Sequence, residues 1–341
     1  MKDESGLNVF DQTQWFGGRC FGLFLVLSFS LSLSLSAFGA NALVPSYPVK
    51  PIRMIVAVPP GGPADNLARL VVPAMTQSLG QMVVIDNRAG ANGNMAYETA
   101  ARAAPDGYTI VLVAAGVSIN PSLYRQVHFD PSKDFVGITQ GIALANILVV
   151  FPGLPVNTLK GLIDYSRAKA VNFASAGSGS TGHLALELFK ISTGLPLVHI
   201  PYKGGGPALT EVIAGQVDAM FSLSLAALPQ IRSGKVRALA ISTLKRSRVA
   251  PDIATVAESG VAGFEVVGWF GWLAPAKTDA SIINRLNKVL VEAIHDEKIQ
   301  ARLVSLGCEP VGSRAQEFSK FVRDEKEKWA SVIKQAGIEL N

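Results

Sequence analysis

The sequence predicts an α/β fold of two lobes with mostly parallel sheets and a ligand cleft between the lobes. Near-continuous apolar runs such as Ile52–Val58 alternate with segments whose apolar residues follow helical spacing, a pattern typical of buried parallel strands joined by helices. Two further apolar runs, Ala145–Phe151 and Val267–Pro275, are predicted to carry the chain between the lobes. Two such crossings form a hinge beside a cleft.

The first 42 residues of the chain have the pattern of an export signal. Arg19 is followed by an apolar stretch rich in Leu, Phe and Ser, and Ala40-Asn41-Ala42 then supplies an A-x-A cleavage site. An uncleaved membrane anchor is the alternative, but the alternating serines and the cleavage site favour a signal peptide. Removal of the signal also removes Cys20, which leaves Cys308 alone and excludes an intrachain disulfide.

The first lobe is predicted to begin with the strand Ile52–Val58. A helix follows, with a stripe formed by Leu67, Leu70, Val71, Ala74, Met75 and Leu79, in which Pro73 should cause a kink or an early end. A short strand at Met82–Ile85, a Gly/Asn loop, a helix near Met95–Ala104 and the strand in PDGYTIVLVAA come next. This order is that of a parallel sheet with helical connections.

The second lobe repeats the alternation, and the chain then returns to the first. Strands are expected at Val171–Ser175, Leu197–Tyr202, Ala219–Ser222 and Val236–Thr243. The C-terminal helix is expected to open with a capping box formed by Ser313 and Gln316. The predicted organisation is a signal peptide at 1–42, a first lobe at 43–147 and 270–341, and a second lobe at 148–269.

Glycine-rich junctions between strands and helices are the most informative local feature. They are PPGGPAD (Pro59–Asp65), the stretch Ser175–His183 and YKGGGPAL, and a fourth junction carries Ser118 and Asn120. Such junctions collect at the carboxyl edge of a parallel sheet, where backbone N–H groups at helix N-termini can hold an anion without charged side chains. Turn formation alone would explain any single one of them, but several together favour a binding site for a small anion.

An enzyme is the alternative reading of the same loops. Gly177, Gly179 and Gly182 spell G-x-G-x-x-G between a predicted strand and helix, as in a nicotinamide-dependent oxidoreductase. The acidic residue that should follow about 20 positions later is missing, since Tyr202-Lys203 stands there. The histidines lack metal-ligand spacing, no phosphate-binding loop occurs, and the formal charge of +5 is spread rather than clustered as in nucleic-acid binding.

Two histidines have open roles at this stage. His183 starts the helix after the glycine loop, where it could donate a hydrogen bond to a ligand carboxylate or serve the helix start itself. His199 lies in a strand pattern and is expected to be a core residue.

The chain resembles the Bug-type periplasmic solute receptors of tripartite tricarboxylate transporters across essentially all of Tyr47–Leu340. The matching stretches are PPGGPADNLAR, NRAGANGN, AAPDGYTIVL, INPSLY, HLALELFK, PYKGGGPAL, GQVDAMF, TVAESG and EKWASVIKQAG. The resemblance implies a periplasmic-binding-protein-like fold and a non-enzymatic, monomeric receptor in the periplasm. Its ligand would be a small organic carboxylate: a di- or tricarboxylate, an acidic amino acid or an aromatic acid. A permease of one large and one small subunit would take up that ligand.

The resemblance also implies where the ligand is held. Main-chain amides of the loops matching Pro60–Asp65 and Ser175–His183 would grip the carboxylate, and neighbouring junctions would line the rest of the pocket, with no metal and no cofactor. The expected ligand-binding residues are Pro60, Gly61, Gly62, Pro63, Ala64, Asp65, Ser118, Asn120, Ser175, Gly177, Ser178, Gly179, Ser180, Thr181, His183, Tyr202, Gly204 and Ser222. Family members often carry an aromatic residue immediately before the paired prolines Pro59-Pro60, where this chain has Val58. The smaller side chain leaves room for a different or bulkier ligand. A receptor that feeds a sensor instead of a permease remains an alternative, as does the nicotinamide enzyme.

Overall fold

The computed structural model describes residues 47–338, so the expected export signal at 1–42 lies outside the described residues. The strands are β1 (Ile52–Val56), β2 (Val83–Asn87), β3 (Thr109–Ala114), β4 (Phe135–Val150), β5 (Asn172–Ser175), β6 (Val198–Pro201), β7 (Ala219–Leu223), β8 (Arg237–Ile241), β9 (Val267–Pro275) and β10 (Glu309–Pro310). The helices are α2 (Pro63–Leu79), α3 (Asn94–Ala101), α4 (Gly116–Leu123), α5 (Leu159–Ala168), α6 (Thr181–Thr193), α7 (Gly205–Ile213), α8 (Ser224–Arg232), α9 (Ala280–His295), α10 (Glu297–Ser305) and α11 (Ala315–Ala336), with a short 3₁₀ turn at Ala91–Gly93.

The strands form one sheet in the order β2-β1-β3-β9-β4-β7-β5-β6, with β8 and β10 also paired to β4. Strand β1 is parallel to β2 and β3, and β5 is parallel to β6 and β7. Strands β4 and β9 run antiparallel to each other and to their other neighbours. The sheet is therefore mixed rather than mostly parallel, because the two connecting strands join two parallel sets.

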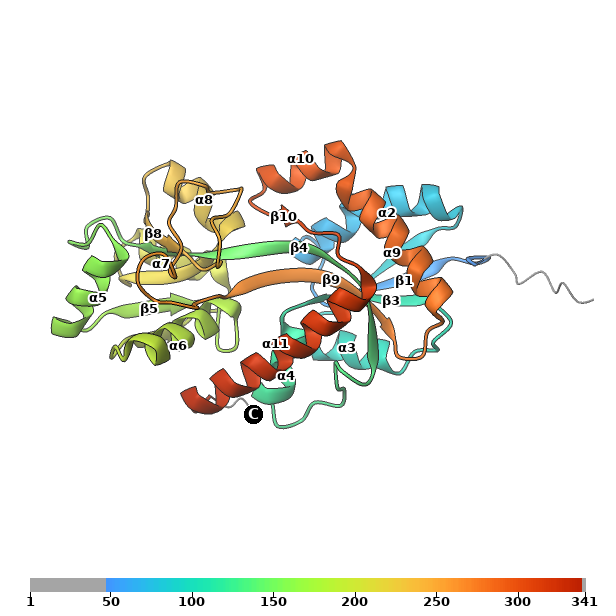
Figure 1. The fold of residues 1–341 in the computed structure, drawn as a ribbon, viewed down its shortest axis with the longest axis horizontal. Coiled ribbons are helices and arrows are strands. Elements are labelled where there is room, and N and C mark those ends of the chain that lie inside the picture. Colours follow the sequence, from blue (N-terminus) through green and yellow to red (C-terminus); the bar gives the residue numbers. More distant parts are fainter. Residues whose placement is uncertain (1–46, 339–341) are drawn as a thin grey trace, which may run out of the picture. The chain divides into compact units, whose positions relative to one another are not determined.

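Strand β4 is longer than the apolar run Ala145–Phe151 had indicated. Its first part, Phe135–Ala145, pairs with β9, and its last part, Asn146–Val150, pairs with β7 and β8. One strand thus belongs to both parts of the sheet, and Figure 1 shows it running between them beside β9.

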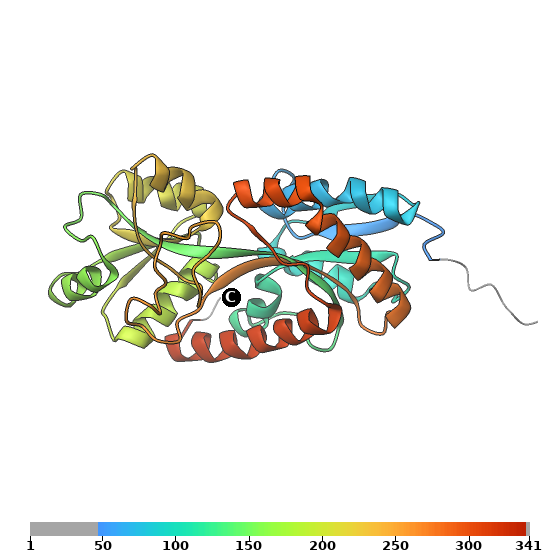
Figure 2. The same cartoon turned by 45° about the horizontal axis from the view of Figure 1, so that its top comes forward.

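Helices cover both faces of the sheet, as expected for an α/β protein. Around β1–β3, helices α2 and α9 lie on one face and α3, α4 and α11 on the other (Figures 1 and 2). Helix α11 packs on β9 through the edge-to-face pair Trp269–Phe318, with ring centroids 5.4 Å apart. The buried Glu325 carboxylate accepts hydrogen bonds from the indoles of Trp269 and Trp329, so the apolar stripe of α11 is core packing.

Two local expectations are wrong. Helix α2 runs without interruption from Pro63 to Leu79, because Pro73 lies on its exposed face, where the carbonyl that loses its partner can face water. Helix α11 begins at Ala315 after an Arg314 N-cap, and Glu317 closes the capping box. Ser313 instead bonds to β4. Its hydroxyl accepts a hydrogen bond from the Gln140 N–H, and its carbonyl accepts one from the Thr139 hydroxyl.

Candidate functional site

A cavity of about 170 Å³ lies where the N-termini of α4 and α6 meet the connecting strands. Its lining comes from the ends of β3 and β7, from β4 and β9, and from the first turns of both helices. The lining residues are Asn92, Ala114, Ala115, Gly116, Ile119, Leu144, Gly179, Ser180, Thr181, Leu223, Gly268, Trp269 and Phe270. It therefore draws on loops at the carboxyl ends of strands in both parts of the sheet.

A second cavity, of about 340 Å³, adjoins the first and shares Asn92, Ala114 and Gly116 with it. It reaches the loop after β1 and the start of α2. Its other lining residues are Ala57, Val58, Pro59, Ala64, Ala89, Gly90, Gly93, Tyr97 and Leu112. Among the described residues that line these two cavities, none carries a charged side chain. Any anion held here would depend on backbone and neutral donors.

The first turn of α6 supplies such donors. The Ser180 hydroxyl caps the helix by accepting the His183 N–H at 3.3 Å. Within the described chain, the N–H groups of Thr181 and Gly182 have no hydrogen-bond partner, as helix geometry leaves them. A Cβ at Gly182 would lie 2.4 Å from the Phe221 carbonyl oxygen, so only glycine lets α6 approach β7 this closely.

Helix α4 supplies a second set of donors at the same cavity. In the part of the chain that the structure describes, the N–H groups of Gly116 and Val117 likewise have no partner. Asn92, which lines both cavities, has a left-handed backbone with φ 54°. The buried Asn120 side chain holds Asn92 in place, because it donates to the Asn92 backbone carbonyl and accepts from the Asn92 side-chain amide, both at 3.0 Å.

The start of α2 differs from the starts of α4 and α6 because a buried carboxylate lies in its first turn. Buried Asp65 accepts hydrogen bonds from the Gly61 N–H at 2.8 Å, the Asn87 side chain at 3.0 Å and Arg69 Nε at 2.8 Å. The Arg69 hydrogen bond is the largest influence on this carboxyl, and the three bonds together lower its pKa to about 2 against the opposing effect of burial. Asp65 thus ties together the loops after β1 and β2.

The structure brings four of the expected ligand-binding residues to the cavities: Gly179, Ser180 and Thr181 at the first, and Ala64 at the second. Pro60, Gly61 and Gly62 lie in the loop before α2, and Ser178 lies in the loop before α6. Pro63 is the first residue of α2 and faces an apolar groove with Leu67 and Leu70.

The other expected residues make contacts within the protein. The Ser118 hydroxyl donates to the Val322 carbonyl oxygen, and the Ser175 hydroxyl lies 2.6 Å from His199 Nε2. The N–H groups of Tyr202 and Gly204 donate to the carbonyls of Ser175 and Ala176, and Ser222 is buried in β7 opposite Ile147. His183 accepts the Gly179 N–H, and Gly177, with φ 122°, accepts the Ser180 N–H and hydroxyl.

Several lining residues were not singled out from the sequence. Asn92 stands in a glycine-containing loop of the same kind as the four junctions, and Gly116 opens the junction that carries Ser118 and Asn120. Gly268, Trp269 and Phe270 belong to β9, where only the pairing with β4 brings them to the cavity. A junction motif could have indicated the first two, but no local signal indicates the β9 residues.

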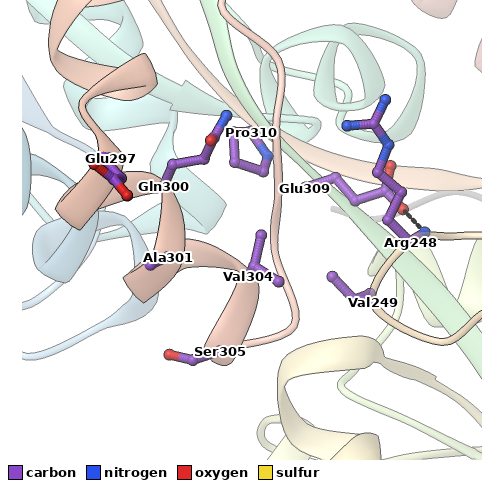
Figure 3. A pocket seen from close by; sticks show the side chains of 9 residues that line it. All are labelled: Arg248, Val249, Glu297, Gln300, Ala301, Val304, Ser305, Glu309 and Pro310. Atoms are coloured by element: carbon purple, nitrogen blue, oxygen red, sulfur yellow. Dashed lines mark hydrogen bonds between the residues drawn. The ribbon is translucent and has the colours of Figure 1, made fainter.

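Two other pockets are less suited to an anion. The larger, of about 680 Å³, lies beside α10, and its lining includes two acidic residues, Glu297 and Glu309, against one basic residue, Arg248 (Figure 3). Glu309 already accepts hydrogen bonds from the Ser247 hydroxyl and the Arg248 N–H. The other is an apolar groove of about 140 Å³ between α2 and α10 that includes Cys308. Within residues 47–338, no cluster of His, Cys, Asp or Glu could hold a metal ion, and no helix has the length and apolar character to cross a membrane.

The fold and the cavity together define a solute-binding protein. Comparison with known sequences supports this class, because the family described as tripartite tricarboxylate transporter family receptor matches residues 67–338. The chain belongs to this family. It is 36% identical over 324 residues to protein BugT of Bordetella pertussis, an alignment that covers 93% of this chain and 98% of BugT.

Solved structures agree with this assignment. The R. palustris protein Rpa4515 with adipate is 34% identical, with a TM-score of 0.75, and the match covers 86% of this chain and all of that one. MatC from Rhodopseudomonas palustris with bound malate is 31% identical, with a TM-score of 0.70, and the match covers 84% of this chain and all of that one. The fold class is confirmed as that of periplasmic binding proteins. The family consists of solute receptors, so the protein is a receptor and not a nicotinamide enzyme.

Proposed function

We propose that this receptor captures a small organic carboxylate at the N-termini of α4 and α6 and delivers it to a permease of one large and one small subunit. The observation that carries the proposal is the set of N–H groups at Gly116, Val117, Thr181 and Gly182, which have no partner among residues 47–338 and belong to two helices that line one cavity. Adipate and malate, the ligands of two related structures, belong to the same chemical class.

Helix N-termini suit a carboxylate that must later be released. Each terminus stabilises a nearby negative charge by about 0.3–1 kcal/mol, and hydrogen bonds from the free N–H groups add to this. A lysine or arginine would hold the ligand more tightly but would slow its release. Because the Asp65 carboxylate lies in the first turn of α2, a second carboxylate there would be repelled, which favours α4 and α6 as the place for the anion.

The proposal includes closure of two lobes, 43–147 with 270–341 and 148–269, around the ligand. Its support is the arrangement of β4 and β9, which are shared between the two parts of the sheet. The first cavity takes lining from β3 and α4 on one side and from α6 and β7 on the other. Bending of two strands would therefore change the width of this cavity directly.

The test is a thermal-shift screen of the chain from Leu43 onward against mono-, di- and tricarboxylates, acidic amino acids, aromatic acids and nicotinamide nucleotides. A ligand that binds only the folded state must raise the melting temperature, by an amount that grows with its concentration over Kd. We expect a group of related carboxylates to do so. An unchanged melting temperature with every carboxylate, or an increase with nucleotides alone, would contradict the proposal.

A pair of variants at Thr181 tests the position of the site. Thr181→Pro removes one free N–H at the first position of α6, where proline is well tolerated, and the extended backbone of Ser180 (φ −67°, ψ 156°) is compatible with a following proline. Thr181→Ala keeps the N–H and serves as the matched control. We expect the proline variant to lose affinity for the carboxylate and the alanine variant to keep most of it.

Delivery, export and assembly need tests of their own. Loss of uptake on deletion of the receptor gene would support delivery to a permease, and unchanged uptake with a lost transcriptional response would support the sensor alternative. Cell fractionation tests the proposed periplasmic location, and size-exclusion chromatography with light scattering tests the proposed monomer.

A further inference from the structure

Two histidines form a stacked pair behind the glycine loop that precedes α6. His183 comes from the first turn of α6 and His199 from the middle of β6, and their ring centroids are 3.8 Å apart with an interplanar angle of 13°. His183 is 4% exposed, so its ring belongs to the interior of the protein. Neither ring lines the cavities that hold the proposed ligand site.

The hydrogen bond from Gly179 determines which tautomer the neutral His183 ring adopts. Its Nδ1 accepts the Gly179 N–H at 3.0 Å, so Nδ1 carries no proton in this arrangement. The proton of the neutral ring is therefore on Nε2, which lies 3.6 Å from Oε1 of the buried Glu187. Glu187 in turn pairs with Lys190 at 3.0 Å.

His199 acts on the other end of the same loop through a serine. Its Nε2 lies 2.6 Å from the Ser175 hydroxyl, and that hydroxyl accepts the Gly177 N–H at 3.1 Å. Gly177 and Gly179 have φ values of 122° and 79°, which favour glycine. The two imidazoles thus hold both left-handed positions of the loop, one directly and one through Ser175.

Few charged groups lie close to the two imidazole rings. Helix α6 itself contributes Glu187 and Lys190, β5 contributes the neutral Ser175 hydroxyl, and β6 contributes His199. Within the described residues, β4, β7 and α11, which also pack on α6, bring no charged group into ion-pair or hydrogen-bond distance of either ring. Burial first, and the proximity of His183 second, lower the pKa of His199 to about 4.

A second proton on His183 would change the loop. The proton would bind to Nδ1, which now accepts the Gly179 N–H. Nδ1 would then be a donor, and two donors would face each other. The Gly179 N–H would lose its partner, and the loop that leads into Thr181 would have to move. Because the pKa of His199 is lowered to about 4, protonation of His199 does not account for a change in the loop at milder acid pH.

We propose that the stacked His183–His199 pair is a positioning element that holds the Gly177–Gly179 loop in its ligand-binding shape only while His183 is neutral, so that acidification releases the ligand. This inference rests on the proposed carboxylate site and adds a regulation to it. His183 is a positioning residue here, since it acts through Gly179 and does not contact the ligand.

The first experiment follows the loop without any ligand. In uniformly ¹⁵N-labelled protein, the Gly179 amide resonance and the His183 ring nitrogens are recorded from pH 8 to pH 4.5. We expect both to titrate with one midpoint, with His183 Nδ1 unprotonated at the upper end. A Gly179 amide that does not follow His183, or a His183 that is protonated at Nδ1 at pH 8, would overturn the proposal whatever the ligand proves to be.

The second experiment measures binding of adipate by calorimetry at pH 7.5 and pH 5.5 in the wild type and in His183→Asn. The Asn Oδ1 can replace Nδ1 as an acceptor but does not titrate in this range. Titration of adipate itself affects both proteins equally. Below the midpoint of His183, we expect the wild type to lose about tenfold more affinity per pH unit than the variant.

Equal pH dependence of the wild type and His183→Asn would overturn the inference and leave the carboxylate site standing. His295→Asn, at an exposed histidine of α9, is the matched control and should show the wild-type pH dependence. His183→Phe keeps a ring in the stack but removes the acceptor, and it should bind weakly at both pH values. If adipate binds none of the proteins at pH 7.5, adipate is not a ligand, and the resonance experiment decides the inference alone.

Discussion

Asn92 and Asn120 exchange two hydrogen bonds that join the loop after β2 to helix α4. Asn120 donates to the Asn92 backbone carbonyl and accepts from the Asn92 side-chain amide, and it also donates to Asn94 Oδ1 at 2.6 Å. Asn120 is completely buried, whereas Asn92 lines both cavities. A core side chain therefore sets the shape of the proposed ligand site.

Replacement of Asn120 should affect stability and binding together. Asn120→Ala leaves the polar groups of Asn92 and Asn94 without partners, which we expect to cost about 1–3 kcal/mol in the free energy of unfolding. Urea denaturation and carboxylate binding are the measurements. Ser166→Ala, which removes a buried hydroxyl bonded only within α5, should cost less and leave binding intact. Equal effects on binding in both variants would contradict the role given to Asn120.

Asp65 should give the protein an acid-sensitive contribution to stability. Its folded pKa of about 2 lies below the ordinary 3.8, so its stabilisation is complete above about pH 5 and is lost progressively as the pH falls through 3.8 towards 2. Asp65→Asn should therefore be less stable than the wild type by about 1 kcal/mol at pH 7, with a smaller difference at pH 2. Asp164→Asn, at an exposed carboxylate of α5, is the control and should show little change.

Gly182 should not tolerate a side chain, although its position is helical. The Cβ of Gly182→Ala would meet the backbone oxygen of Phe221 at 2.4 Å, and a backbone atom cannot rotate away. We expect a loss of about 1–3 kcal/mol in stability and weaker ligand binding. Gly206→Ala in α7 has no atom within 4 Å of the added carbon, and it should be neutral or slightly stabilising. A neutral Gly182→Ala would show that α6 and β7 are not held this closely.

Val58 should set the upper size of the ligand. It lines the second cavity, so Val58→Trp should fill part of that space and weaken binding of bulky aromatic acids by about tenfold or more while small dicarboxylates still bind. Competition binding against one reference carboxylate gives the comparison. Val84→Trp, on an exposed strand position, is the control. An unchanged ligand range in Val58→Trp would place the ligand elsewhere.

Cys308 should be unreactive in the folded protein. Burial raises the pKa of its thiol to about 11, so thiol reagents at pH 8 should react about a hundredfold more slowly than after unfolding in urea. The double variant Ser305→Cys, Cys308→Ser moves the thiol to an exposed position of α10 and should react rapidly without urea. Rapid reaction of native Cys308 would show that the groove around it opens.

The alternation of strands and helices was predictable because the local spacing of apolar residues indicates each element. Strands such as β1 and β5 lie within two residues of their predicted limits. The full length of β4 was not predictable, because its first part is a strand only through pairing with β9, far along the chain. The residues of a strand that depends on distant pairing indicate that strand only weakly.

The candidate site shows the same division between local and distant signals. The glycine junction before α6 was recognised from its sequence, and the structure brings Gly179 and Thr181 to the cavity. The sequence places Ser118 and Asn120 in a junction after a strand, but α4 already begins at Gly116. Helical geometry then turns both side chains into the core, where they bond to Val322, Asn92 and Asn94. The phase of a short helix depends on where it begins, and the sequence did not indicate that residue.

The place of β9 in the sheet has a consequence for the order in which the molecule can assemble. Strand β9 lies between β3 and β4, yet it is made after every other strand except β10. Before residues 267–275 are made, β3 can pair with β1 and β4 with β7 and β8, but no strand connects β3 to β4. Non-local pairing such as that of β9 is slow to form. We therefore expect a chain that stops before Val267 to remain unfolded in its first part, and the last quarter of the sequence to determine when the whole molecule becomes compact.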